Sequence, residues 1–112
     1  MKAEDRIRIQ HIVDAGEEAL SFLENVEFEK FSHNRMLILS VIKDIEITGE
    51  AASKITTETK TKYDNIPWKD IVGMRNRLIH GYFEVDIKLV WNTAKNNLPQ
   101  LLNSLKEIII QE

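Results

Sequence analysis

The densest group of reactive side chains in this chain lies between residues 75 and 82, which read Arg-Asn-Arg-Leu-Ile-His-Gly-Tyr. An arginine can hold a phosphate through paired hydrogen bonds, and a histidine can transfer protons near neutral pH. Cleavage of RNA by its own 2′-hydroxyl needs a base for that hydroxyl, an acid for the departing 5′-oxygen and a cation at the phosphate. Arg75 and His80 together provide the chemistry for this reaction without a metal ion.

The spacing of these residues sets how they could meet. One histidine cannot readily act as base and acid at once, which favours a symmetric dimer with two copies of His80. On a regular helix Asn76 and His80 lie four positions apart and share a face, so we expect Asn76 to orient the imidazole. Arg75 lies about 140° from His80 around such a helix. It would reach the same place if the helix ends near Gly81, or it would meet the histidine of a second subunit.

A structural interpretation of the same residues is also open. Cations are favourable at the C-terminus of a helix, and a glycine often ends one. Chemistry alone therefore leaves both interpretations standing. His11 and His33 have no comparable neighbours, and we expect both at the surface. The aspartates show no metal-ligand spacing with a histidine, so neither a metal site nor a cofactor is expected.

Composition limits the class of protein. The length of 112 residues fits one domain, residues 1–112. Hydrophobic residues make up 43% of the chain, enough for a packed core, and there is no cysteine, which excludes disulfides and thiolate metal sites. Apolar runs are too short to cross a membrane, and the first six residues are too charged for a secretory signal. We therefore expect a cytoplasmic protein without a membrane partner.

The charge pattern is uneven along the chain. The net charge of −3 argues against strong nonspecific binding to nucleic acid, but it permits a local basic site. Acidic residues dominate from 17 to 29, and basic residues are concentrated in the middle of the chain. Such a dipolar surface suits a small RNA footprint or an acidic partner, with ordinary solvated helix faces as an equal alternative. The basic residues concerned are Lys54, Lys60, Lys62, Lys69, Arg75 and Arg77.

The hydrophobic spacing is helical throughout and predicts an all-α fold. The first helix has about six turns, and a second runs from after Glu29 to about Lys60. Asn34 interrupts the second apolar stripe, so we expect it to be a buried polar group that needs partners. Gly49 lies near this stripe, where a missing side chain permits close approach of another helix. Residues 56–66 are expected to be a frayed helix end followed by a loop. The first stripe consists of Ile9, Ile12, Val13, Gly16, Ala19, Leu20 and Leu23.

The second half of the chain predicts two further helices. The third begins around Pro67, which the first turn of a helix tolerates, and stops at Gly81. Asp86 is suited to cap the fourth helix. Pro99 lies inside the apolar run of the fourth helix without breaking its phase, which predicts a kink or a tight junction between nearly collinear helices. The third helix is expected to face inward with Trp68, Ile71, Val72, Met74, Leu78 and Ile79.

The expected architecture is a small antiparallel bundle of four long helices, the last kinked or split near Pro99. A bundle this small exposes much apolar surface. The aromatic residues Trp68, Trp91 and Phe83 suit either the core or a subunit interface. We therefore expect a homodimer.

Four stretches of the chain resemble a known family. The motif Arg-Asn-x-x-x-His-x-Tyr, preceded by Ile66-Pro67-Trp68 and followed by Phe83, is similar to that of HepT-type toxins of the HEPN superfamily. The resemblance extends to Val90-Trp91, to the element Leu98-Pro99-x-Leu101 and to the start of the chain at Asp5-Arg6-Ile7. It therefore covers essentially the full chain.

The resemblance implies an all-helical homodimer encoded beside a minimal nucleotidyltransferase antitoxin. It further implies a metal-independent endoribonuclease toxin of a type VII-like toxin–antitoxin system. Arg75 and His80 correspond to the catalytic pair at a dimer cleft, and Asn76 to a supporting residue. Tyr82 corresponds to the tyrosine that the antitoxin modifies with AMP. The alternative is a noncatalytic module that binds a nucleotide or forms part of a nucleotidyltransferase complex.

Overall fold

The computed structural model describes residues 1–80 and 84–112, without the side chain of His80. The described chain is almost entirely helical, and its one hairpin pairs Ile79 with Val85 and His80 with Glu84. In chain order the elements are α1 (Ala3–Phe22), α2 (Phe28–Ser32), α3 (Arg35–Ser53), α4 (Thr57–Lys62), α5 (Trp68–Leu78), β1 (Ile79–His80), β2 (Glu84–Val85), α6 (Ile87–Asn92), the π-helical turn η1 (Thr93–Asn97) and α7 (Leu98–Gln111).

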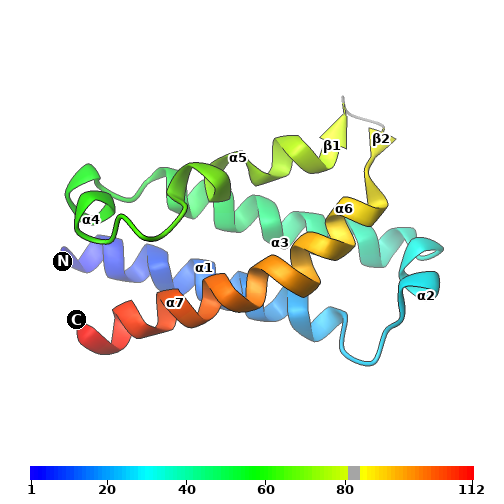
Figure 1. The fold of residues 1–112 in the computed structure, drawn as a ribbon, viewed down its shortest axis with the longest axis horizontal. Helices are drawn as coiled ribbons and strands as arrows, with labels where there is room; N and C mark the ends of the chain where they lie inside the picture. The colour runs from blue at the N-terminus through cyan, green and yellow to red at the C-terminus, as the bar shows by residue number, and fades with distance from the viewer. Residues whose placement is uncertain (81–83) are drawn as a thin grey trace.

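The four long segments run alternately up and down, as Figure 1 shows, with both ends of the chain at the same end of the bundle. Apolar side chains from every long helix are buried in one cluster, including Ile9 of α1, Ile45 of α3, Ile71 of α5 and Leu105 of α7. Each of these is at most 1% exposed. The predicted antiparallel helical bundle is therefore confirmed.

The segment expected to form one helix from after Glu29 to Lys60 forms three helices instead, α2, α3 and α4. Asn34 separates the first two. Its side chain is exposed and accepts a hydrogen bond from the Leu37 N–H at 3.0 Å, which caps α3. The expectation that Asn34 is a buried polar group was therefore wrong. An asparagine that satisfies a free N–H at a helix start needs no burial.

Residues 56–66 were expected to fray, but they contain α4. Asp5 of α1 is fully buried and accepts hydrogen bonds from the Thr56 N–H at 3.1 Å and from the Thr56 and Thr59 hydroxyls at 2.5 Å each. Burial acts to raise the pKa of Asp5, but these hydrogen bonds outweigh it and hold the pKa below its ordinary value of 3.8. A carboxylate from α1 therefore anchors the start of α4, which local sequence patterns do not reveal.

The last segment was predicted correctly. Asp86 caps α6 by accepting a hydrogen bond from the Leu89 N–H at 3.0 Å. Pro99 lies in the first turn of α7, directly after the widened turn η1. A proline lacks the N–H that the preceding turn would use, and a π-helical turn accommodates that loss. As Figure 1 shows, α6, η1 and α7 continue in one general direction without a reversal.

Gly49 brings α3 and α5 into close contact, as expected. A Cβ atom at Gly49 would lie 3.1 Å from the carbonyl oxygen of Ile71 and 3.3 Å from that of Val72. This crossing determines which residues of the two helices face each other. Within the part of the chain that the structure describes, no helix combines the length and apolar character needed to cross a membrane.

Candidate active site on α5

Helix α5 carries Arg75, Asn76 and Arg77 in its second half. The helix begins at Trp68, whose side chain is buried. The indole Nε1–H of Trp68 donates a hydrogen bond to the Tyr63 carbonyl at 3.0 Å. Trp68, Ile71, Met74 and Leu78 face the core, as predicted. Val72 does not, because it is 40% exposed on the side of α5 that faces solvent beside α3. That expectation was wrong.

Arg75 lies at a shallow groove of about 220 Å³ between α3 and α5. Its side chain is 43% exposed, and its Nε lies 3.9 Å from Glu46 Oε1 on α3. Glu46 precedes Gly49 by three residues, and Arg75 follows Val72 by three, so the close crossing at Gly49 brings the two groups together. Asn76 lines the same groove. Arg75 is therefore accessible to a ligand and loosely paired with one carboxylate.

The helix ends earlier than expected. Its last residue is Leu78, and Ile79 is extended, with φ −126° and ψ 122°. The Asp86 N–H donates to the Leu78 carbonyl at 2.8 Å, which closes the hairpin that follows. His80 therefore lies in β1 and not one helical turn after Asn76, so the expectation of a continuous helix through both residues was wrong, while the contact between their side chains stays a prediction. Extended backbone at Ile79 changes the direction of the chain between the two residues.

Three residues named from the sequence, Gly81, Tyr82 and Phe83, lie outside the described residues, as does the side chain of His80. The predicted helix end at Gly81 falls there too, although α5 itself already ends at Leu78. The convergence of the Arg75 guanidinium with the His80 imidazole stays a prediction. What the structure places is the backbone of His80, two residues past the end of α5 and paired with Glu84 across the hairpin.

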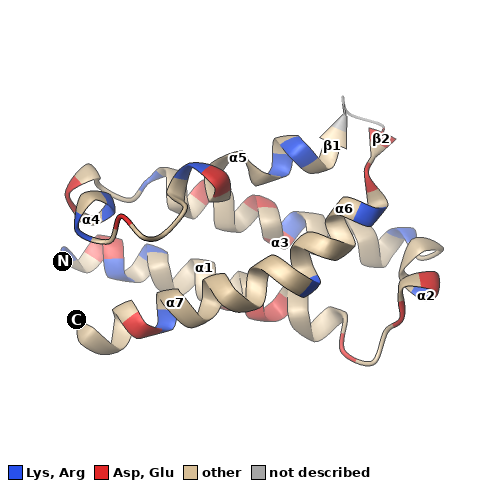
Figure 2. Ribbon diagram, in the orientation of Figure 1, with Lys and Arg blue, Asp and Glu red and all other residues tan. Residues whose placement is uncertain are grey.

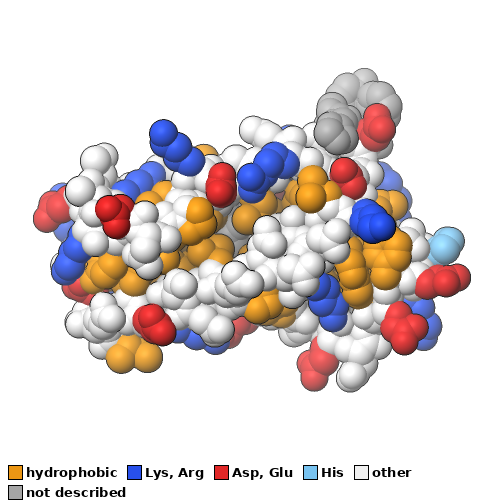
Figure 3. Space-filling model, viewed as in Figure 1, with side chains coloured by type: hydrophobic (Ala, Val, Ile, Leu, Met, Phe, Trp, Pro, Cys, Tyr) orange, Lys and Arg blue, Asp and Glu red, His pale blue; other side chains and the backbone are white. Residues whose placement is uncertain are grey.

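Arg77 has different surroundings from Arg75. Its Nη1 lies 3.5 Å from Asp70 Oδ1, and its Nη2 donates to the Asp70 carbonyl at 3.1 Å. It borders a groove of about 260 Å³ that α5 forms with α6, η1 and α7. Figure 3 shows hydrophobic side chains in the hollow between these elements. The two arginines of the motif therefore serve different grooves.

Much of the positive charge in the middle of the chain is paired with carboxylates. Besides Arg75 and Arg77, Lys54 lies 3.2 Å from Glu50 and Lys62 lies 2.7 Å from Glu112. In residues 1–80 and 84–112, no carboxylate lies within ion-pair distance of Lys60 or Lys69. As Figure 2 shows, basic positions occur at both ends of α5. The site is therefore locally basic without an excess of unpaired charge around Arg75.

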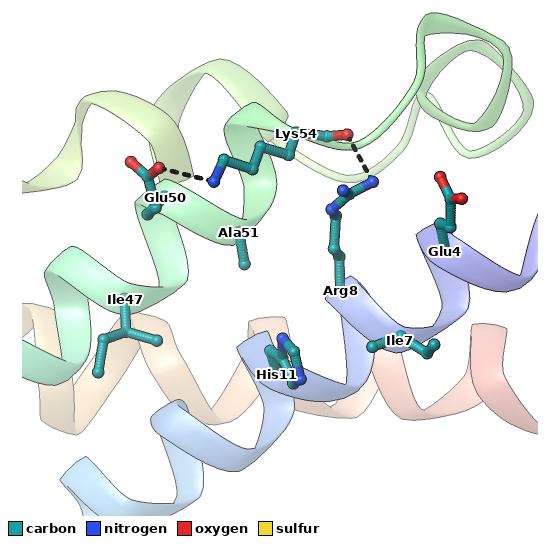
Figure 4. A pocket seen from close by; sticks show the side chains of 8 residues that line it. All are labelled: Glu4, Ile7, Arg8, His11, Ile47, Glu50, Ala51 and Lys54. Carbon is teal, nitrogen blue, oxygen red and sulfur yellow. Dashed lines mark hydrogen bonds and ion pairs between the residues drawn. The ribbon is translucent and has the colours of Figure 1, made fainter.

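His11 and His33 are exposed, as predicted. His11 borders a third groove, of about 350 Å³, between α1 and α3 (Figure 4). Arg8 also borders it and donates to the Lys54 carbonyl at 3.3 Å. Arg8 and His11 were not expected to border one groove, although their i, i+3 spacing places them on one face of α1. Glu46 was not expected at the site either, and its position one turn before Gly49 was the available signal.

The described residues contain no group of three His, Cys, Asp or Glu side chains that could hold a metal ion. The arrangement on α5 provides an accessible guanidinium and a neighbouring amide, followed in the chain by a histidine. Chemically, such a set can bind a phosphate and place a proton-transfer group near it.

Comparison with known proteins assigns the family. Residues 12–108 match the family described as Ribonuclease HepT-like. A "Putative RNase" of Methanocaldococcus jannaschii is 38% identical over 98 residues, covering 88% of this chain and 81% of that protein. A "Putative RNase" of Caldanaerobacter subterraneus subsp. tengcongensis is 34% identical over 104 residues, covering 93% of each chain. A "Probable ribonuclease HepT" of Thermococcus cleftensis is 32% identical over 108 residues, covering 96% of this chain and 98% of that protein.

No solved structure matches the chain. The family match begins within α1 and ends within α7, so it includes the whole of α5, the hairpin and η1. The chain therefore belongs to the Ribonuclease HepT-like family of the HEPN superfamily.

Proposed function

We propose that this chain is a ribonuclease toxin that cleaves RNA endonucleolytically through Arg75 and His80. The observation that carries the proposal is the position of Arg75, half-exposed at a groove and held by a single carboxylate at 3.9 Å. An exposed ion pair of this kind contributes at most about 1 kcal/mol, so a phosphate can displace Glu46. The names of the relatives support RNA as the substrate class.

The proposed reaction needs no redox step. The His80 imidazole takes the proton of the 2′-hydroxyl, whose oxygen then attacks the neighbouring phosphorus. The bond from phosphorus to the 5′-oxygen breaks, and a protonated imidazole donates a proton to that oxygen. Arg75 donates hydrogen bonds to the phosphate oxygens, where negative charge builds up in the transition state. The products are a 2′,3′-cyclic phosphate and a 5′-hydroxyl.

The two proton transfers require two imidazoles or a change of protonation within one turnover. We propose that a homodimer supplies the second His80, with Arg75 and His80 of both subunits at a shared cleft. Asn76 borders the Arg75 groove and supports the bound phosphate. This role replaces its expected hydrogen bond to His80 within one helix.

We further propose that a cognate minimal nucleotidyltransferase neutralises the toxin by transferring AMP to Tyr82. Tyr82 lies two residues after His80 in the chain, so the added phosphate would bring negative charge near the site of RNA binding. The chain has two tyrosines, and Tyr63 contacts Glu112 through its hydroxyl. Mass spectrometry after coexpression should therefore find AMP on Tyr82 and not on Tyr63, and modification of Tyr63 alone would contradict the proposal.

The test of the nuclease uses purified protein, RNA substrates and excess EDTA. We expect the wild type to cleave RNA, and Arg75→Ala and His80→Ala each to reduce the rate by at least about 100-fold. Arg77→Ala is the matched control, because it removes an equally charged side chain from the same helix at a different groove. It should retain activity within about threefold, since surface substitutions have small effects.

Two results would count against this function. The wild type could fail to cut RNA and fail to slow growth when expressed alone, which would favour the noncatalytic nucleotide-binding alternative. Arg75→Ala and His80→Ala could also cleave as fast as Arg77→Ala. Circular dichroism of each variant shows whether a lost activity reflects a lost fold.

A further inference from the structure

A larger groove lies next to the Arg75 groove. It has a volume of about 710 Å³ and is formed where the end of α3 meets the α4–α5 connection and the first half of α5. Ser53 and Val72 border both grooves. The two grooves are therefore adjacent, and only these shared residues separate a ligand bound at Arg75 from the larger groove.

The larger groove has an apolar floor and a charged rim. Ile66 and Trp68 are almost fully buried beneath it, and the indole N–H of Trp68 is already satisfied by the Tyr63 carbonyl. Lys60 and Lys69 border the groove from α4 and α5. Two carboxylates, those of Asp64 and Asp70, also border it. Asp70 also borders the Arg77 groove, where it pairs with Arg77 at 3.5 Å.

These features fit one class of ligand. A nucleobase presents a flat apolar face that packs on aromatic and aliphatic side chains, while its phosphate attracts lysines at the rim. Trp68 and Arg75 are seven residues apart on α5, about 10 Å along the helix axis, a span comparable to one or two nucleotides. We propose that the larger groove is a subsite for an RNA nucleotide one position beyond the two that flank the phosphate held by Arg75. This inference rests on the proposed ribonuclease function.

Gly73 makes the subsite testable. It borders the groove, and a Cβ atom built on it would meet nothing within 4 Å. A side chain at this position therefore starts in open space at the edge of the groove, and we expect a large one to extend into it. Because Gly73 lies within a helix, replacing it also removes the helical penalty of glycine. Gly73→Phe should consequently fold and fill the subsite.

The first measurement is binding, which does not depend on cleavage. A fully 2′-O-methylated RNA decanucleotide lacks the attacking hydroxyl and can be followed by fluorescence anisotropy. We expect Gly73→Phe to weaken its binding about tenfold, on the scale of one lost stacking contact. A separate variant that combines Lys60→Ala with Lys69→Ala should bind the RNA more weakly than the wild type at low salt, and its affinity should depend less on salt concentration. Asn103→Phe on the exposed side of α7 is the control, an equally bulky change that should leave binding unchanged.

The second measurement separates the subsite from the reaction itself. Gly73→Phe should lose about tenfold in kcat/KM on an unmodified decanucleotide, mainly through KM. It should cleave a dinucleoside monophosphate at the wild-type rate, because that substrate does not extend into the groove.

If Gly73→Phe binds the methylated RNA as tightly as the wild type does, the RNA subsite is excluded. The same result is expected if the groove binds a partner protein instead of RNA. If the wild type cleaves RNA in that case, the ribonuclease function remains supported. If the wild type does not cleave RNA but Gly73→Phe still weakens RNA binding, the ribonuclease function is excluded and the RNA subsite remains supported.

Discussion

At the scale of single residues, position decides what identical side chains do. Arg75 and Arg77 are separated by one residue, yet they face different grooves and different carboxylates. Arg77 makes two contacts with Asp70, one to its carboxylate and one to its backbone. Arg75 makes one long, half-exposed contact with Glu46. The weaker pairing leaves Arg75 the better placed of the two to exchange its partner for a phosphate.

Asp44 is a second residue whose surroundings determine its chemistry. It is 2% exposed on α3, and its Oδ2 is buried without a hydrogen-bond partner in the described part of the chain. Burial raises the pKa of Asp44 to about 7, and the neighbouring Glu18 carboxyl adds to the effect. The folded protein therefore holds a proton on Asp44 that the unfolded chain would release.

This predicts a specific dependence of stability on pH. Below the ordinary pKa of 3.8, both states hold the proton. Between 3.8 and about 7, only the folded state does, so the free energy of unfolding falls as pH rises through that window. Asp44→Asn cannot ionise, and it should lose less stability than the wild type between pH 5 and pH 8. Urea unfolding at both values measures this, and equal losses in the two proteins would refute the shifted pKa.

At the scale of elements, the crossing of α3 and α5 positions the site. Gly49 allows the carbonyl groups of α5 to approach α3, and one turn away Glu46 meets Arg75. The backbone of α5 cannot easily yield, because Trp68, Ile71 and Met74 fix it in the core. A side chain at Gly49 would therefore have to separate the two helices.

A pair of glycine substitutions tests this. Gly49→Ala should lower the free energy of unfolding by about 1–2 kcal/mol, because overpacking outweighs the gain in helix propensity. Gly73→Ala, in open space on the facing helix, should raise it by about 0.5–1 kcal/mol. Denaturant titration of the two variants measures both changes. If Gly49→Ala and Gly73→Ala have the same free energy of unfolding, the close contact at Gly49 does not restrict the approach of α3 and α5.

At the scale of the whole molecule, one exposed face suits a second copy of the chain. Met36, Leu39 and Ile47 are 82%, 43% and 38% exposed and lie along one side of α3. Glu46 and Val72 extend this face to the Arg75 groove. A partner packed here would cover apolar surface and bring its own motif near Arg75, as the proposed two-histidine reaction requires.

We therefore expect this face to form the dimer interface. Leu39→Arg should convert the protein to a monomer and reduce RNA cleavage, because a charge buried in an interface is costly. Ile110→Arg, at an 83% exposed position of α7, is the matched control and should remain dimeric and active. Light scattering after size exclusion gives the molar mass. A wild-type monomer, or a dimeric and fully active Leu39→Arg, would exclude this interface.

Much of the bundle could be predicted from local patterns. The spacing of apolar residues predicted the long helices, Asp86 predicted a helix start, and the unbroken phase across Pro99 predicted that the chain does not reverse there. Gly49 predicted a close approach. Each of these features depends on neighbours within about one or two helical turns, and a sequence records such neighbours directly.

Other features depended on contacts between distant residues. Asp5 accepts hydrogen bonds from the start of α4 across 51 residues of sequence, and the threonine-rich stretch that was expected to fray is helical there. Asn34 caps the start of α3 and so separates it from α2. Its place in an apolar stripe had suggested that it would be buried instead. The early end of α5 at Leu78 moved His80 from a helix to a strand, because the hairpin bond from Asp86 competes with another helical turn.

The groups available for chemistry, the helical spacing of apolar residues and the membership in a ribonuclease family all follow from the order of residues alone. Only the packed helices show which arginine is accessible, which carboxylate opposes it and which groove lies beside it. The difference arises because side-chain identity and spacing are local properties. Accessibility, pairing and pKa arise from helices that pack against each other from distant parts of the chain.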